Sequence, residues 1–279
     1  MSVQVVTDST CDLPESVVQE HGIRVVPLYI HIGTKEYLDG VELSREEFYK
    51  GLPTYESPPT TAAPGIDTFT QVYEQLAAEG ATGIVSIHIS ETLSNVVNVA
   101  QLAAQKMETI PVKVIDSGQL TLGVGLMSLV AARVSKAGGT MDKVVAAVQD
   151  LIPRTYTFAA LSTVEFLRRS GRLTQFQSGL ATLLKILPLL KMHSGVAEME
   201  RVRTRERAIR RLLQLVHDLG PLEQLAVVHT NAPQAAAALH RRAQPLIPEG
   251  TEPIYAQVTS VIGAHIGPGA VGFVCVTQE

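Results

Sequence analysis

The sequence predicts an α/β protein made of two α/β units, the first with a mainly parallel sheet flanked by helices and the second with a mixed sheet. Three observations predict this class. Hydrophobic residues make up 46% of the 279 positions, enough to build a large core. Short apolar runs alternate with helical patterns along the chain. Charge is divided unevenly, because residues 1–150 hold 9 basic and 18 acidic side chains and residues 151–279 hold 14 and 9. We therefore expect the two units to be residues 1–150 and 151–279.

In the first unit, strand and helix patterns follow one another in the order that is typical of a parallel sheet. One helix is predicted from Ser44, because Ser44 and Glu47 can form a capping box. A second is predicted over Gly65–Glu79, and Gly80 can end it. The predicted strands are Val3–Thr7, Ile23–Ile30, Gly83–His88 and Val112–Ile115.

Two helices, Leu122–Ala137 and Met141–Ile152, separated by a Gly-Gly pair, are predicted to lead into the second unit. That unit is predicted to hold a leucine-rich segment at Leu180–Met192 and a helix at Thr204–Leu219. Its predicted strands are Thr157–Leu161, Glu198–Arg203, Leu225–His229, Pro253–Val258 and Gly272–Thr277.

Missing motifs disfavour several function classes. The chain has no GxxxxGK[ST] loop, no GxSxG elbow and no HExxH, and its one GxG, at Gly123 and Gly125, lacks the third glycine of a dinucleotide site. The two cysteines, Cys11 and Cys275, lack zinc-like spacing, which predicts a reduced cytoplasmic protein without a metal or other cofactor. The longest stretch without acidic or basic side chains, Pro253–Gln278, is too polar to span a membrane, and the N-terminal residues do not resemble a signal peptide.

Hydroxyl side chains follow several predicted strands. In open α/β sheets ligands bind beyond the carboxyl ends of the strands, so these segments are candidate sites. Serine and threonine also cap helices, and capping explains each single hydroxyl equally well. Several such segments at one edge would instead favour an anion site. The segments are Asp8–Thr10, Ser90–Ser94, Asp116–Gly118 and the proline-rich loop Ser57–Gly65.

Two further features carry candidate functional groups. His265 lies in a glycine-rich segment, Gly263–Gly269, which we expect to be a loop approached closely by a ligand or held by a carbonyl. An arginine run without interleaved aromatic residues gives no support for nucleic-acid binding and is either a solvated face or a docking surface for a protein or phosphorylated ligand. Its members are Arg201, Arg203, Arg205, Arg207, Arg210 and Arg211.

Seven short motifs together resemble the DegV family of fatty-acid-binding proteins, in the order expected and over essentially the whole chain. They are Asp8–Pro14, Thr60–Pro64, Ser90–Ser94, Val114–Ser117, Ser170–Leu173, Val202–Thr204 and Ala264–Gly269. The resemblance implies a non-enzymatic carrier with a long-chain fatty acid such as palmitate between two α/β units, its tail in an apolar tunnel. It also implies a partner, a separate fatty acid kinase that phosphorylates the bound lipid.

The resemblance also assigns residues. Thr61 and Ser94 match the ligands of the carboxylate, and His265 matches a histidine beside the headgroup. Arg172 and Arg203 match arginines that handle phosphate or dock the kinase. The chain departs from the family pattern near the headgroup, where Glu91 would place a like charge if it pointed inward. The other departures are Ala62, Ala63, Thr92 and Asn95.

Two alternatives stay open. An esterase or acyl transferase could use Ser94 or Ser9 with His265, because such pairs are defined by geometry that a sequence does not show. A regulatory module could instead bind a small anion through the same loops.

Overall fold

The computed structural model describes residues 2–175 and 187–278, and it confirms the predicted α/β class. The first half of the chain forms a sheet with strand order β2-β1-β6-β7, in which all neighbouring strands are parallel. The strands are β1 (Val3–Asp8), β2 (Arg24–Val26), β6 (Gly83–His88) and β7 (Val112–Asp116).

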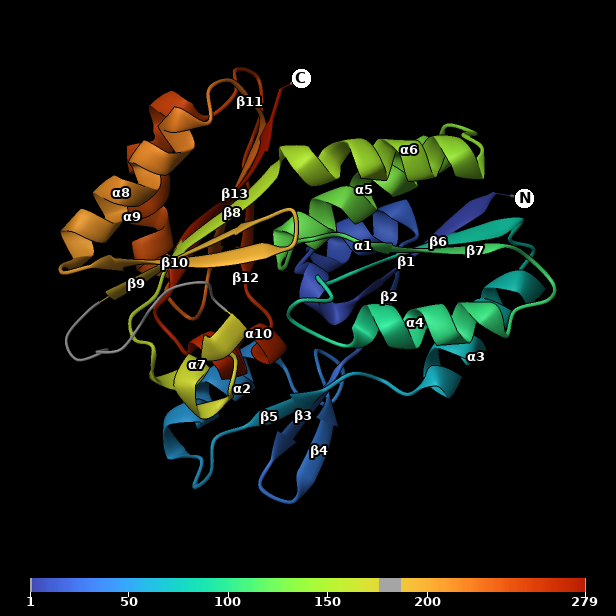
Figure 1. The fold of residues 1–279 in the computed structure, drawn as a ribbon, viewed down its shortest axis with the longest axis horizontal. Coiled ribbons are helices and arrows are strands. Elements are labelled where there is room, and N and C mark those ends of the chain that lie inside the picture. Colours follow the sequence, from blue (N-terminus) through green and yellow to red (C-terminus); the bar gives the residue numbers. More distant parts are fainter. Residues whose placement is uncertain (1, 176–186, 279) are drawn as a thin grey trace.

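Helices cover both faces of this sheet (Figure 1). On one face lie α3 (Ile66–Ala78) and α4 (Val96–Gln105). On the other lie α1 (Glu15–His21), α5 (Leu122–Lys136) and α6 (Met141–Leu151).

A small third sheet was not predicted. It has the order β4-β3-β5 and consists of β3 (Tyr29–Ile32), β4 (Lys35–Leu38) and β5 (Thr60–Ala62). The predicted strand Ile23–Ile30 is therefore wrong, because β2 and β3 belong to different sheets. Pro27 lies between them, and proline has no N–H to continue a ladder. The predicted loop Ser57–Gly65 is wrong in part, since its middle is β5.

The second half forms a mixed six-stranded sheet with the order β10-β9-β8-β13-β11-β12. Only β11 and β12 in it are parallel to each other. Of the predicted leucine-rich segment Leu180–Met192, residues 180–186 lie outside the described residues. The strands are β8 (Thr155–Ala160), β9 (Leu187–His193), β10 (Val196–Val202), β11 (Leu222–His229), β12 (Ile254–Gln257) and β13 (Val271–Thr277).

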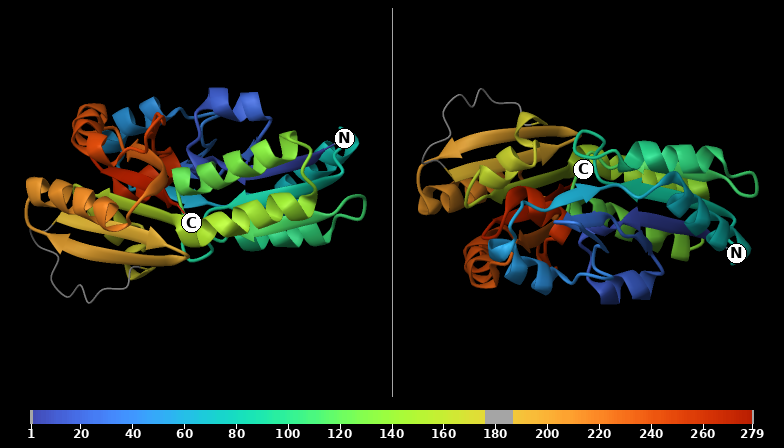
Figure 2. Two further views of the ribbon diagram at one scale, coloured as in Figure 1. Left: turned by 90° about the horizontal axis from the view of Figure 1, so that it is seen from above. Right: turned by 90° about the horizontal axis from the view of Figure 1, so that it is seen from below.

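Two helices, α8 (Arg205–Asp218) and α9 (Pro233–Ala243), cover one face of this sheet, as Figure 2 shows from above and below. The remaining helices are α2 (Arg45–Gly51), α7 (Glu165–Arg169) and α10 (Ser260–Ile266). Short 3₁₀ turns cover Ser9–Cys11, Leu52–Thr54, Ile152–Arg154, Leu173–Gln175 and Gln244–Leu246.

The capping box at the start of α2 is confirmed. Ser44 Oγ accepts a hydrogen bond from the Glu47 N–H at 3.2 Å, and Glu47 Oε2 accepts one from the Ser44 N–H at 3.1 Å. The predicted loop around His265 is wrong, because residues 260–266 form α10.

The larger hydrophobic core runs through both halves, from Val3 in β1 to Val276 in β13. A smaller core lies between the six-stranded sheet and the helices α8 and α9. The other face of that sheet is turned toward the first half of the chain (Figure 1). The division into units at residue 150 stays a prediction.

Candidate functional site

Two adjoining cavities lie between the halves of the chain. Counting the space at their openings, they hold about 560 and 830 Å³ that protein atoms leave free. Both are lined by Leu93 and Leu120 from the first half and by Leu190, Ile262 and Ile266 from the second. Because they share these walls, the two cavities are direct neighbours.

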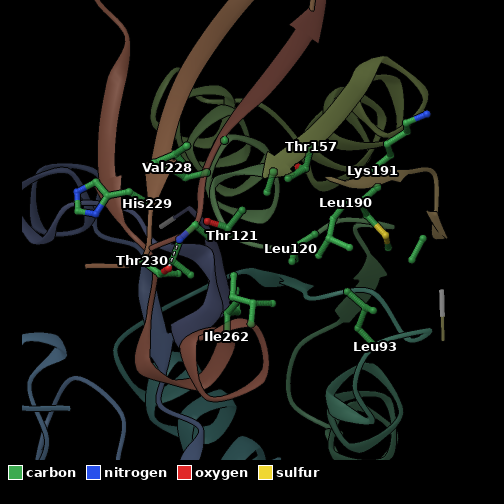
Figure 3. Close-up of a pocket in the computed structure, with 18 residues that line it drawn as sticks. Leu93, Leu120, Thr121, Thr157, Leu190, Lys191, Val228, His229, Thr230 and Ile262 are labelled. Carbon is green, nitrogen blue, oxygen red and sulfur yellow. Dashed lines mark hydrogen bonds between the residues drawn. The ribbon is translucent and has the colours of Figure 1, made fainter. Parts of the chain in front are cut away.

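The smaller cavity, called the apolar cavity below, is shown in Figure 3. The side chains of Leu93, Leu120, Leu190 and Ile262 surround its space, whereas the ammonium group of Lys191 extends away from it. The other apolar lining residues are Ala159, Met192, Ala197, Val228, Val258, Ile266, Ala270 and Val271.

The threonine hydroxyls of the apolar cavity already have partners. Thr121 Oγ1 donates to Asp12 Oδ2 at 2.6 Å, and Thr157 Oγ1 donates to Gln119 Oε1 at 2.8 Å. Thr230 Oγ1 accepts from the Ala270 N–H at 2.9 Å. The cavity therefore offers an occupant mainly hydrocarbon contacts.

The larger cavity, called the mixed cavity, has polar as well as apolar side chains in its lining. It is lined by Thr61 on β5, Ser94 just before α4, His265 in the last turn of α10, and Arg172 beyond α7. Four of the five residues singled out from the sequence thus line one cavity. Arg203 is exposed where β10 ends and does not line it.

His265 is directly linked to Thr61, with 2.8 Å between His265 Nε2 and Thr61 Oγ1. Burial, together with the positive charge of Arg172, lowers the pKa of His265 to about 4. The ring is therefore neutral near pH 7 and carries one N–H. If that N–H is on Nε2, it donates to Thr61 and leaves the threonine hydroxyl free to donate to an anion.

The start of α4 provides further donors beside Ser94. Its N-cap residue, Asn95, makes no side-chain hydrogen bond to the backbone of the first turn. Asn95 Oδ1 instead accepts from the side chain of Asn98 at 2.8 Å. Uncapped N–H groups at the start of a helix favour an anion, so the part of the mixed cavity beside Ser94 is suited to a carboxylate.

The residues that depart from the family pattern lie in different places. Ala62, Ala63 and Asn95 line the mixed cavity. Glu91 is exposed, and its backbone N–H donates to Asp116 at 3.3 Å. Its carboxylate does not line the mixed cavity, so the like charge considered from the sequence is not placed there.

Most of the hydroxyls that follow strands cap the backbone instead of lining the site. Ser9 Oγ accepts from the Leu28 N–H at 3.2 Å, and Ser117 Oγ accepts from the Gln119 N–H at 3.1 Å. Among the three hydroxyl-bearing segments after strands β1, β6 and β7, only Ser94 contributes a hydroxyl to the mixed cavity. No hydrogen bond joins His265 to Ser9 or Ser94 in the described part of the chain.

A buried Asp–His–Ser hydrogen-bond network was not predicted from the sequence, because Asp8 lies on β1 whereas Ser86 and His88 lie on β6. His88 Nδ1 lies 3.0 Å from Asp8 Oδ2, and its Nε2 lies 2.7 Å from Ser86 Oγ. Tyr73 Oη donates to Ser86 Oγ at 2.8 Å. The exposed fraction of all four side chains is 0%, and none lines either cavity, so this network serves the core.

The fold and the site together define an α/β protein with an apolar and a mixed cavity between the two halves of its chain. The comparisons then place it: the model of the DegV family matches residues 2–278, and the chain belongs to this family. Within residues 2–175 and 187–278, no helix has the length and hydropathy to cross a bilayer. Nor does that part of the chain hold a group of three His, Cys, Asp or Glu side chains that could bind a metal ion.

Three relatives illustrate the similarity. A DegV domain-containing protein of Streptomyces coelicolor is 36% identical over 98% of this chain and 97% of its own length. The structure of a DegV family protein from Thermus thermophilus, described as binding fatty acid, has a TM-score of 0.90 at 32% identity, with both chains fully covered. DegV of Bacillus subtilis, described as a fatty acid binding protein, has a TM-score of 0.89 at 28% identity over 99% of this chain and 100% of that one.

Proposed function

We propose that this protein binds one long-chain fatty acid such as palmitate and carries it in the cytoplasm without acting as an enzyme itself. The observation that carries the proposal is the pair of adjoining cavities, one lined mainly by hydrocarbon side chains and the other also by hydroxyl groups. The fatty-acid-binding descriptions of the Thermus and Bacillus relatives support it. The tail lies in the apolar cavity and the carboxylate in the mixed cavity.

The tail supplies most of the binding free energy. Burying each CH₂ group contributes roughly 0.8 kcal/mol, so a chain of about sixteen carbons contributes on the order of 13 kcal/mol before the cost of ordering ligand and protein is subtracted. Because the threonines of the apolar cavity are already hydrogen-bonded, the tail leaves no buried hydroxyl unpaired there.

The carboxylate sets the orientation of the ligand. We assign it to the hydroxyls of Thr61 and Ser94, with neutral His265 holding Thr61 as a donor. Hydrogen bonds to a charged group contribute about 1.5 to 3 kcal/mol each, which is enough to favour one direction of entry. Arg172, on the same cavity, adds a positive charge near the headgroup.

The partner is a separate fatty acid kinase, as the family resemblance implies. We assign Arg172 and the exposed Arg203 to phosphate handling or docking of that kinase. Their positions support different roles, because Arg172 lines the cavity and Arg203 lies outside it.

Chain-length dependence tests the proposed function. The delipidated protein should bind palmitate much more tightly than butyrate in a calorimetric titration, because each further CH₂ buried strengthens binding by roughly fourfold. Equal affinity for both acids would instead indicate a sensor of small anions, for which the tail is irrelevant.

A further inference from the structure

The residue just before α10 is held by two buried carboxyl groups from the first half of the chain. The backbone N–H of Thr259 donates to Asp12 Oδ1 at 2.7 Å, and the Thr259 hydroxyl donates to Asp39 Oδ2. Asp12 is 1% exposed and Asp39 3% exposed. The start of α10 is therefore fixed by carboxyl groups more than 200 residues away in the sequence.

Two side chains of α2 hold the same turn. Arg45 donates to the carbonyl of Gln257, and Tyr49 Oη donates to the carbonyl of Val258 at 3.0 Å. Helix α10 packs directly on Tyr49, since a Cβ added at Gly263 of α10 would lie 2.4 Å from Tyr49 Oη. Little room is left for α10 to approach α2 more closely.

This helix forms one wall of the proposed lipid site. Val261, Ile262, His265 and Ile266 of α10 all line the mixed cavity. Any displacement of α10 thus moves the wall and changes the 2.8 Å contact between His265 and Thr61.

Asp12 also reaches the apolar cavity, through its 2.6 Å hydrogen bond from Thr121. Asp12 and Thr121 both have positive φ angles, of 54° and 51°. Non-glycine residues rarely adopt this conformation, and it persists where surrounding contacts over-determine it. The backbone at Asp12 and Thr121 is therefore held in this conformation by the surrounding contacts.

The cluster has two carboxyl groups and one permanent cation. Arg45 Nη2 lies 3.2 Å from Asp12 Oδ1, while Asp39 Oδ1 has no partner among the described residues. Burial raises the pKa of Asp12 to about 7, Arg45 opposes this rise, and Asp39 adds to it. Burial also raises the pKa of Asp39. Near neutral pH the pair therefore gains a proton that isolated carboxylates would not hold.

The thiol and the phenol that face Asp12 stay neutral in this range. Burial raises the pKa of Cys11 to about 12 and that of Tyr49 well above its ordinary value. The groups that face Asp12 are Cys11 beside it, Asp39 after β4, Arg45 and Tyr49 on α2, and the hydroxyls of Thr121 and Thr259.

We propose that Asp12, together with Asp39, is a positioning residue for lipid binding: its carboxylate holds α10 in the lipid-binding position, and protonation of the pair weakens binding. The inference rests on the proposed function. The physical reason is that a protonated Asp12 loses its ion pair with Arg45 and has one acceptor site fewer for its three donors.

The test is the affinity of the full chain for palmitate as a function of pH. For the unmodified protein we expect a loss on the order of tenfold as the pH falls through about 7. Asp12→Asn keeps an acceptor oxygen for Thr259 but cannot titrate, so this step should disappear. Asp39→Asn removes a negative neighbour and should move the midpoint to lower pH, whereas Arg45→Gln removes a positive one and should move it to higher pH.

The pH midpoint of palmitate binding should move in opposite directions in Asp39→Asn and Arg45→Gln. A general loss of stability would not produce such opposite shifts, so they identify a positioning role. Asp142→Asn, at an exposed carboxylate on α6, is the matched control and should keep the original profile. Circular dichroism checks that each variant is folded, and if Asp12→Asn is not, the other two variants decide.

Two results would overturn the inference: an unchanged step in folded Asp12→Asn, or shifts of the same sign in Asp39→Asn and Arg45→Gln. In either case, if the protein still binds palmitate, the proposed function is unaffected. No binding of palmitate at any pH would contradict the proposed function and the inference together.

Discussion

Replacement of both Thr61 and Ser94 by alanine is expected to lower the affinity for palmitate by roughly 10²- to 10⁴-fold and to leave the fold unchanged. The expectation follows from the loss of two hydrogen bonds to a charged group, each contributing about 1.5 to 3 kcal/mol. Both residues are only partly buried and line the mixed cavity, so their truncation leaves the main core intact. A fluorescent fatty-acid displacement assay measures the change.

Two controls define this experiment. Thr61→Ser keeps the hydroxyl and should retain most of the affinity. Thr60→Ala removes an exposed hydroxyl from the neighbouring position of β5 and should have no effect. An alanine double variant that binds palmitate as tightly as the unmodified protein would contradict the assignment of the headgroup site.

The second large effect concerns stability and arises in the buried Asp8 network. Asp8→Ala is expected to lower the free energy of unfolding by about 3 to 5 kcal/mol, the cost of removing one partner of a buried hydrogen-bonded pair. It would leave the ring of His88 and the N–H groups of Thr10 and Ile89 without their acceptor. Urea unfolding followed by circular dichroism measures the loss.

The matched control is Asp67→Ala, because Asp67 is 87% exposed and pairs with the exposed Lys106. Exposed ion pairs contribute about 0 to 1 kcal/mol, so its effect should be small. Equal stabilities for the Asp8 and Asp67 variants would show that the buried network does not stabilise the fold.

Acid should remove part of the contribution of Asp8. Burial alone would raise the pKa of Asp8, but the hydrogen bonds with His88, Thr10 and Ile89 and the charge interaction with His88 together outweigh burial, and the pKa is lowered. A carboxyl group with a lowered folded-state pKa stabilises the protein above its unfolded value, here 3.8, and loses this contribution as the pH falls through the folded value.

Local signals predicted the longer elements well. The helix predicted at Leu122–Ala137 is α5, Leu122–Lys136, because its apolar pattern and the following glycine pair are readable along the chain. The third sheet was missed because β5 has only three residues and pairs with β3, some thirty positions earlier. Strands this short show no alternation that could identify them.

The roles of the site residues stay a prediction, although four of the five residues line one cavity. The resemblance to the family singled out Thr61, Ser94, His265 and Arg172, which the fold brings to one cavity. The helical conformation around His265 was missed because its glycines indicate a loop, whereas packing against α2 stabilises the helix.

Contacts between distant residues explain what else was missed. The hydrogen bond between Asp12 and Thr259 joins residues 247 positions apart, and a single sequence holds no signal for such a pair. The Asp8–His88 pair, 80 positions apart, is of the same kind. The Asp8–His88 pair follows from the pairing of β1 with β6, whereas the Asp12–Thr259 bond joins the two halves of the chain.

The central claim is that the site between the halves of the chain holds one fatty acid. Organic extraction and mass spectrometry of the natively purified protein, with an unrelated protein from the same host as control, test it most directly. The account predicts about one long-chain fatty acid per chain, since such affinities survive purification. A protein that carries no lipid and also fails to take up added palmitate would contradict it.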